Sequence, residues 1–167
     1  MLKEIDNLVL MSLHAWRGRI ASQSSLAEEL RVSTAGLSRS LDRLDFARLI
    51  HRPDLTIVKP HVEEYLAHSL RYVFPVRLGT KVRGVPTAHS APPLRDEIAS
   101  QETYVWSADF GKTSGLEVIP LHENVPALSI AYPSLYPVFA VLDAIRIGRS
   151  RERRLAVRYL KEWLSND

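Results

Sequence analysis

The sequence predicts an α+β protein, and three observations support this fold class. Apolar residues recur at helical spacing in three segments before residue 47 and in two segments after residue 133. Short stretches rich in β-branched and aromatic residues lie between these helical segments. The 167 residues, 46% of them hydrophobic and 25% charged, have the composition of an ordinary globular chain. Such a chain buries enough surface to fold without a disulfide or a metal ion.

The first helix is expected over residues 3–17, because its apolar residues recur every three or four positions. They are Ile5, Leu8, Val9, Leu13 and Trp16. Gly18 follows, where a left-handed residue ends many helices.

Two more helices follow closely. Ser22 and Ser25 are alternative N-caps for the second helix, and Ser25 places Glu28 at the spacing of a capping box. Ser33 is the expected N-cap of the third helix. Its buried stripe consists of Leu37, Leu41 and Leu44.

The segment SQSSLAEELRVSTAGLSRSLDRL resembles the helix-turn-helix core of bacterial winged-helix regulators of the MarR-like type. Small Ala27 stands where the two helices would cross, and Val32 takes the buried position of the turn. Arg31 replaces the usual turn glycine. The resemblance covers residues 1–60 and implies a winged helix-turn-helix DNA-binding domain. Residues 49–52 and 55–59, which flank a Pro-Asp turn, are expected to form the two strands of the wing.

The outward face of the third helix is expected to contact DNA, because small residues at its start allow close approach to the major groove. Arg39 has the reach for a guanine or a phosphate, and Arg43 for a phosphate. Arg52 and Lys59 would touch the backbone from the wing, or serve only as edge charges. An ordinary solvated helix face, or one that contacts protein, is the alternative. The predicted DNA-binding residues are Gln23, Ser33, Thr34, Ala35, Gly36, Ser38, Arg39, Arg43, Arg52 and Lys59.

Residues 61–74 are expected to form a linker or dimerisation helix that Pro60 opens and that ends before Pro75. Residues 74–93, rich in proline and basic residues, are expected to form an irregular arm. Residues 103–107 and 116–121 are predicted as a short β-hairpin joined by the loop ADFGKTSG.

Two helices are expected to close the chain, with Ser134 and Ser150 as their caps and Gly148 between them. Their apolar residues are more than two isolated helices can cover, which favours a homodimer. The last helix also carries a basic face, interpreted as a partner-binding or phosphate-contacting surface or, alternatively, as a solvated face. This face consists of Arg151, Arg154, Arg158 and Lys161. Residues 75–167 would thus serve dimerisation, sensing or partner binding.

The stretches RYVFP, RGVPTAHSAPPL and LYPVFAVLDAIRIGRSRER resemble a family of prokaryotic winged-helix proteins. Proteins of this kind include transcription regulators and the antitoxin halves of toxin–antitoxin pairs. Some are abortive-infection antitoxins that pair with nucleotidyltransferase toxins. The resemblance implies that such roles are open to this chain.

Several kinds of chemistry are not supported. The chain has no cysteine, its six histidines form no metal-binding pair, and the GKT triplet has Trp106 where a phosphate-binding loop needs its first glycine. We therefore expect no cofactor, no metal and no enzymatic activity. The uncharged run Asn124–Leu142 is interrupted by three prolines, and the N-terminus lacks a signal-peptide pattern. These features predict a cytoplasmic protein that does not enter a membrane.

The leading hypothesis is a sequence-specific, DNA-binding transcriptional regulator that acts as a dimeric repressor on double-stranded DNA. The alternative is an antitoxin-like protein that neutralises a partner toxin, for example a nucleotidyltransferase, and regulates its own operon.

Overall fold

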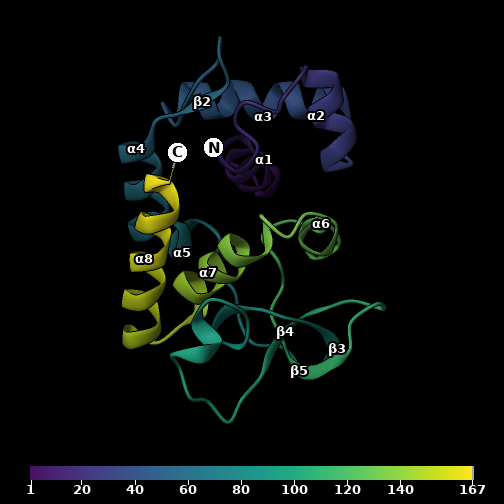
Figure 1. The fold of residues 1–167 in the computed structure, drawn as a ribbon, viewed down its shortest axis with the longest axis vertical. Helices are drawn as coiled ribbons and strands as arrows, with labels where there is room; N and C mark the ends of the chain where they lie inside the picture. Colours follow the sequence, from purple (N-terminus) through teal and green to yellow (C-terminus); the bar gives the residue numbers. More distant parts are fainter. Residues whose placement is uncertain (167) are drawn as a thin grey trace.

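The structure, a computed structural model, describes residues 1–166 and shows an α+β protein. Figure 1 shows its layers along the long axis. Helices α2 (Gln23–Leu30) and α3 (Thr34–Phe46) form one end, with α1 (Glu4–Ala15) directly beneath them. The three helices predicted for the first 46 residues are therefore confirmed.

The structure defines the N-caps of α2 and α3 and the residue that ends α2. Ser22 is the N-cap of α2 and accepts a hydrogen bond from the backbone N of Ser25, which lies at the third helical position. Ser33 caps α3 by accepting a bond of 2.9 Å from the backbone N of Gly36. Arg31 ends α2 with a left-handed φ of 56°, the conformation that the usual turn glycine adopts without strain.

A short hairpin and a long helical segment follow α3. Strands β1 (Ile50–His51) and β2 (Thr56–Ile57) pair antiparallel, shorter than the predicted strands. Helix α4 (Lys59–Glu64) then continues through a π-helical turn (Tyr65–Ser69) into α5 (Leu70–Val73), which ends before Pro75 as predicted.

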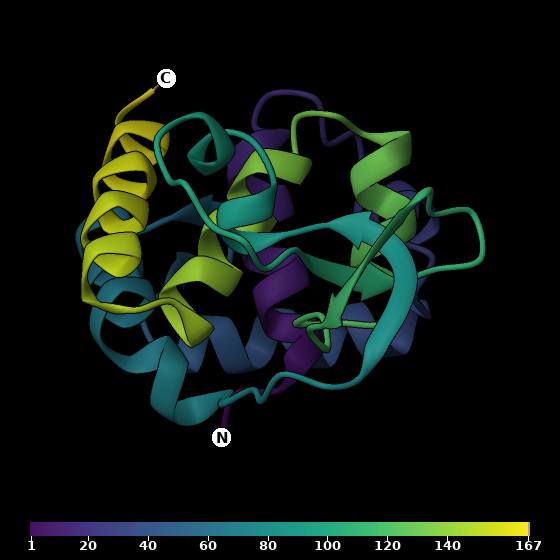
Figure 2. The same cartoon turned by 90° about the horizontal axis from the view of Figure 1, so that it is seen from below.

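The predicted C-terminal hairpin is wrong. Residues 74–93 include a strand, β3 (Lys81–Pro86), that pairs antiparallel with both β4 (Tyr104–Ser107) and β5 (Thr113–Glu117). Strands β4 and β5 consequently run parallel, and the three strands close on one another (Figure 2). Gly84 makes this closure possible, because a Cβ at this position would lie 1.7 Å from the carbonyl O of Trp106.

Three helices follow the strands in the described part of the chain. Helix α6 (Val125–Ala131) was not predicted, since its segment was interpreted only as a proline-interrupted run. Helix α7 (Tyr136–Ile147) begins after Leu135, not Ser134: with Ser134 as the cap, Pro137 would be the third residue and has no N–H to donate. Helix α8 (Ser150–Ser165) has Arg149 at its N-cap instead of Ser150, and the Glu152 carboxylate accepts the Arg149 backbone N–H.

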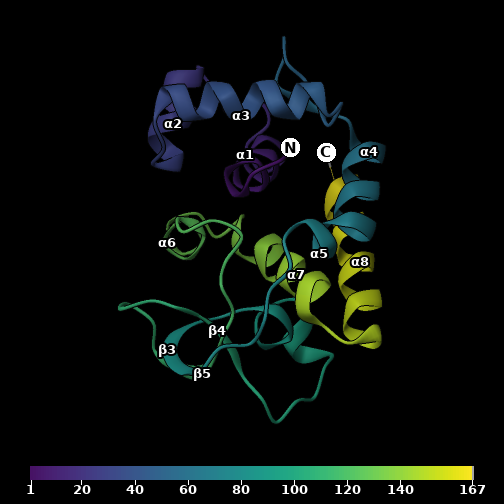
Figure 3. The ribbon, with the colours of Figure 1, turned by 180° about the vertical axis from the view of Figure 1, so that it is seen from behind.

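Helix α1 lies at the centre of the molecule, between α3 on one side and α6 and α7 on the other (Figures 1 and 3). Nine consecutive residues, Asp6 to His14, are buried, although its sequence pattern indicated an amphipathic helix. The imidazole Nε2 of His14 lies 3.0 Å from the carbonyl O of Trp163 on α8. The C-terminal region therefore covers the side of α1 that faces away from α3.

A single hydrophobic core joins the three predicted regions, from Leu8 on α1 to Leu164 on α8. The homodimer was predicted from the apolar residues of the last two helices, Leu135, Phe139, Leu142, Tyr159, Trp163 and Leu164. Four of these, Leu135, Phe139, Leu142 and Leu164, are each at most 2% exposed inside this core. They no longer argue for a dimer, which stays an untested prediction. Among residues 1–166, no helix combines the length and apolar character needed to cross a membrane.

Candidate nucleic-acid interface

Helix α3 lies at one end of the molecule with its outer face uncovered (Figure 1). Thr34, Ala35 and Arg39 are exposed on its first two turns, and Ser38 is half-buried between them. The opposite stripe of Leu37, Leu41 and Leu44 is fully buried, as predicted. The helix thus presents small residues followed by an arginine to the solvent.

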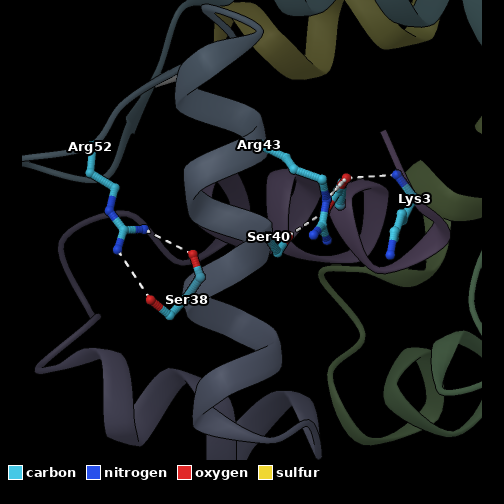
Figure 4. Close-up of polar contacts among 6 residues, drawn as sticks. Lys3, Ser38, Ser40, Arg43 and Arg52 are labelled. Atoms are coloured by element: carbon cyan, nitrogen blue, oxygen red, sulfur yellow. Dashed lines mark hydrogen bonds and ion pairs between the residues drawn. The ribbon is translucent and has the colours of Figure 1, made fainter. Parts of the chain in front are cut away.

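Helix α3 is fixed to α1 through a buried carboxylate, shown in Figure 4. Asp6 on α1 is 1% exposed and accepts hydrogen bonds from Ser40 Oγ at 2.6 Å, Arg43 Nε at 2.9 Å and Arg43 Nη2 at 2.7 Å. The hydrogen bond to Asp6 raises the pKa of Arg43 above its ordinary value. The guanidinium predicted to contact a phosphate therefore also positions α3, through its Nε and Nη2. Its phosphate contact stays a prediction.

Arg52 joins the β1–β2 hairpin to α3 (Figure 4). Its Nη1 donates to the carbonyl O of Ser38 and its Nη2 to Ser38 Oγ, both at 3.4 Å. The same guanidinium lies 3.5 Å from the carboxylate of Asp42. The hairpin is thereby held beside the outer face of α3.

The remaining predicted DNA-binding residues lie around the same face. Gln23 is the exposed first residue of α2, and Lys59 is the half-buried first residue of α4. Ser33 is occupied as the N-cap of α3. Gly36 is half-buried, and a Cβ there would lie 2.9 Å from Ser33 Oγ, so a larger residue would require the Ser33 hydroxyl to shift.

Sequence reasoning missed three residues on the outer face of α3. Asp42, Asp45 and Phe46 are all exposed, and Phe46 is 92% exposed. Their helical spacing from Ala35 and Arg39 would have revealed them. Since Asp42 and Asp45 repel phosphates, the face suited to DNA is restricted to the first two turns of α3.

The four residues of the predicted basic face of α8 differ in whether they have a carboxylate partner. Arg158 lies 3.2 Å from the Glu97 carboxylate, and Lys161 lies 3.5 Å from that of Glu63. Within residues 1–166, Arg151 and Arg154 have no carboxylate partner. All four belong to a helix that runs along the side of the molecule, away from the outer face of α3 (Figure 3).

No site for a metal ion is found in the described part of the chain. Residues 1–166 contain no group of three or more metal-ligating side chains. The most buried carboxylate of the C-terminal region, Asp143, is occupied by hydrogen bonds from Thr87, Trp106 and Arg146. No protein-family model, curated protein or solved structure matches this chain.

Proposed function

We propose that the protein is a sequence-specific, double-stranded-DNA-binding transcription regulator whose residues 1–60 form a winged helix-turn-helix. The first two turns of α3, uncovered and bordered by the β1–β2 hairpin, carry this proposal. A recognition helix enters the major groove with its N-terminal residues against the base edges. We further propose a dimeric repressor, which would bind a palindrome with half-sites one helical turn apart.

Each residue of this face has a separate role in the proposal. Arg39 donates to a guanine, because its guanidinium is exposed and has the geometry for O6 and N7. Thr34, Ala35 and Ser38 allow the helix to approach the groove. Gln23 contacts the phosphate backbone from the start of α2. Arg52 keeps the hairpin beside α3.

The experiment is selection of bound fragments from a random-sequence duplex pool, followed by affinity measurements on the selected site. Replacing Arg39 with Ala should weaken specific binding by about 1–3 kcal/mol. The fold should survive, because Arg39 is exposed and off the buried stripe. Arg77→Ala, which removes an exposed arginine outside residues 1–60, is the matched control and should bind as the parent protein does. Equal affinity of Arg39→Ala and the parent would contradict the assignment.

A second candidate function is an antitoxin-like protein that holds a toxin partner. It is favoured by exposed apolar residues around one groove, where Val73 is 45% and Ile119 56% exposed, next to Arg77. The test is co-expression with the product of the neighbouring gene and measurement of a complex by size-exclusion chromatography. Ile119→Asp should abolish the complex, whereas Ile130→Asp, at an equally exposed position on α6, should not. A complex that survives Ile119→Asp would rule out this groove.

A further inference from the structure

A groove of about 540 Å³ lies between α5 and the first turns of α8. Its polar lining consists of basic and hydroxyl-bearing residues, with no carboxylate among them. The lining includes Arg71 and Tyr72 from α5, and Ser150, Arg153 and Arg154 from α8. Figures 1 and 3 place these segments side by side and away from the outer face of α3.

The arginines of this groove differ from the other basic residues of α8. Arg158 and Lys161 are each paired with a carboxylate of another element. Within residues 1–166, no carboxylate is paired with Arg71, Arg153 or Arg154. Arg153 Nη1 donates to the carbonyl O of Gly148 at 3.3 Å, which leaves its other N–H groups for a ligand. Three positive charges from two helices therefore line one depression without a carboxylate, and a multivalent anion would reduce their mutual repulsion.

An aromatic ring accompanies these charges. The Tyr72 side chain is 74% exposed and lines the groove, with the guanidinium carbon of Arg71 5.3 Å from the centre of its ring. An exposed ring next to phosphate-binding cations is the arrangement that stacks a base while arginines hold the phosphates. The volume of the groove is within the range of small-ligand sites.

We propose that this groove binds a nucleotide, with Arg71, Arg153 and Arg154 on its phosphates and its base against Tyr72. Helices α5 and α8, which line the groove, lie away from the outer face of α3 (Figure 3). The nucleotide site is therefore separate from the DNA interface and does not depend on the proposed function. Ser150, at the first position of α8, supplies a hydroxyl to the same phosphates.

The test is calorimetric titration of the full chain with ATP, pyrophosphate and adenosine, in the absence of DNA. We expect ATP to bind, pyrophosphate to bind more weakly and adenosine weakest. Arg71→Gln combined with Arg154→Gln should weaken ATP and pyrophosphate tenfold or more, since each arginine makes charge-assisted hydrogen bonds. Tyr72→Ala should weaken ATP several-fold and leave pyrophosphate unchanged. Circular dichroism and thermal unfolding check that the variants fold.

Arg151→Gln is the matched control, because Arg151 is an exposed arginine of the same helix outside the groove. It should bind ATP as the parent protein does. Absence of ATP binding by the parent, or equal binding by the double variant and Arg151→Gln, would overturn the proposal. Equal affinity for ATP and pyrophosphate would overturn the proposal in favour of a site for simple anions. Tighter binding of a twelve-nucleotide single strand than of ATP would overturn it in favour of a site for a nucleic-acid strand.

Discussion

Each of the two regions of this molecule is held together by a buried carboxylate, and the two carboxylates differ in the exposure of their arginine partners. Asp6 in the N-terminal region and Asp143 in the C-terminal region are each 1% exposed, and each is paired with an arginine at 2.7 Å. The side chain of Arg43, the partner of Asp6, is 21% exposed, whereas that of Arg146, the partner of Asp143, is 4% exposed. The Asp6–Arg43 pair is therefore partly hydrated, whereas the Asp143–Arg146 pair is almost fully shielded from water.

The two networks also differ in what they connect. Asp6 joins neighbouring helices, α1 and α3. Asp143 accepts bonds from Thr87 Oγ1 at 2.7 Å and Trp106 Nε1 at 2.6 Å, while Arg146 donates to the carbonyl oxygens of Phe74 and Ile119. One buried pair on α7 thus fixes four segments that are distant in sequence. Burial raises the pKa of the Asp143 carboxyl, although Arg146 and the other donors oppose this shift.

Removing the dry carboxylate should have the largest effect. Asp143→Ala leaves the Arg146 guanidinium buried without its counter-charge and leaves Thr87 and Trp106 without an acceptor. We expect the free energy of unfolding to fall by about 3–5 kcal/mol, measured by urea denaturation. A loss below 1 kcal/mol would show that the C-terminal region does not depend on this network.

Removing the partly hydrated carboxylate should cost less. Asp6→Asn removes the negative charge between Arg43 and Ser40, but the exposed part of Arg43 can turn to water. We expect a loss of about 1–3 kcal/mol in the same denaturation experiment. The comparison fails if Asp6→Asn destabilises the chain as much as Asp143→Ala does, because burial of the arginine would then not decide the cost.

The two regions also differ in how well the sequence predicts their structure. Residues 1–60 carry local signals, such as the Ser33 cap and the buried leucine stripe of α3, and their three helices were predicted correctly, although the strands of the hairpin are shorter than predicted. Strand β3 contains Gly84 and Pro86, residue types that are rare in strands, and only its distant partners β4 and β5 make it a strand. No local pattern predicts such pairing.

Contacts between residues distant in sequence also limit what can be predicted about the candidate interface. The exposure of Arg39 followed from helical spacing alone. The commitment of Arg43 to Asp6 required knowing that α1 lies against α3, a contact between residues 37 positions apart. The groove between α5 and α8 was beyond prediction for the same reason, since Arg71 and Arg154 come from helices that only the fold brings together.

One contact connects the two regions at the turn before α3. The Asn124 side chain at the start of α6 donates to the carbonyl oxygens of Leu30 and Arg31, both at 3.1 Å. The Asn124 backbone N–H in turn donates to His122 Nδ1 at 3.1 Å, which requires this nitrogen to be unprotonated. The C-terminal region thereby holds the end of α2 through the Asn124 side chain, while the Asn124 backbone is held by a separate hydrogen bond that depends on the charge state of His122.

Protonation of His122 should therefore produce the smallest of the three effects. Burial lowers the pKa of His122 below its ordinary value of 6.5, although Glu123 and Glu4 oppose this shift. The unfolded chain then binds more protons than the folded one, so stability is full above about pH 6.5, declines as the pH falls below it, and levels off under the folded pKa. His122→Gln retains a polar side chain but does not titrate. Thermal unfolding between pH 8 and pH 5 should show a steeper decline for the parent than for His122→Gln, and parallel curves would mean that this histidine does not link pH to the contact between the two regions.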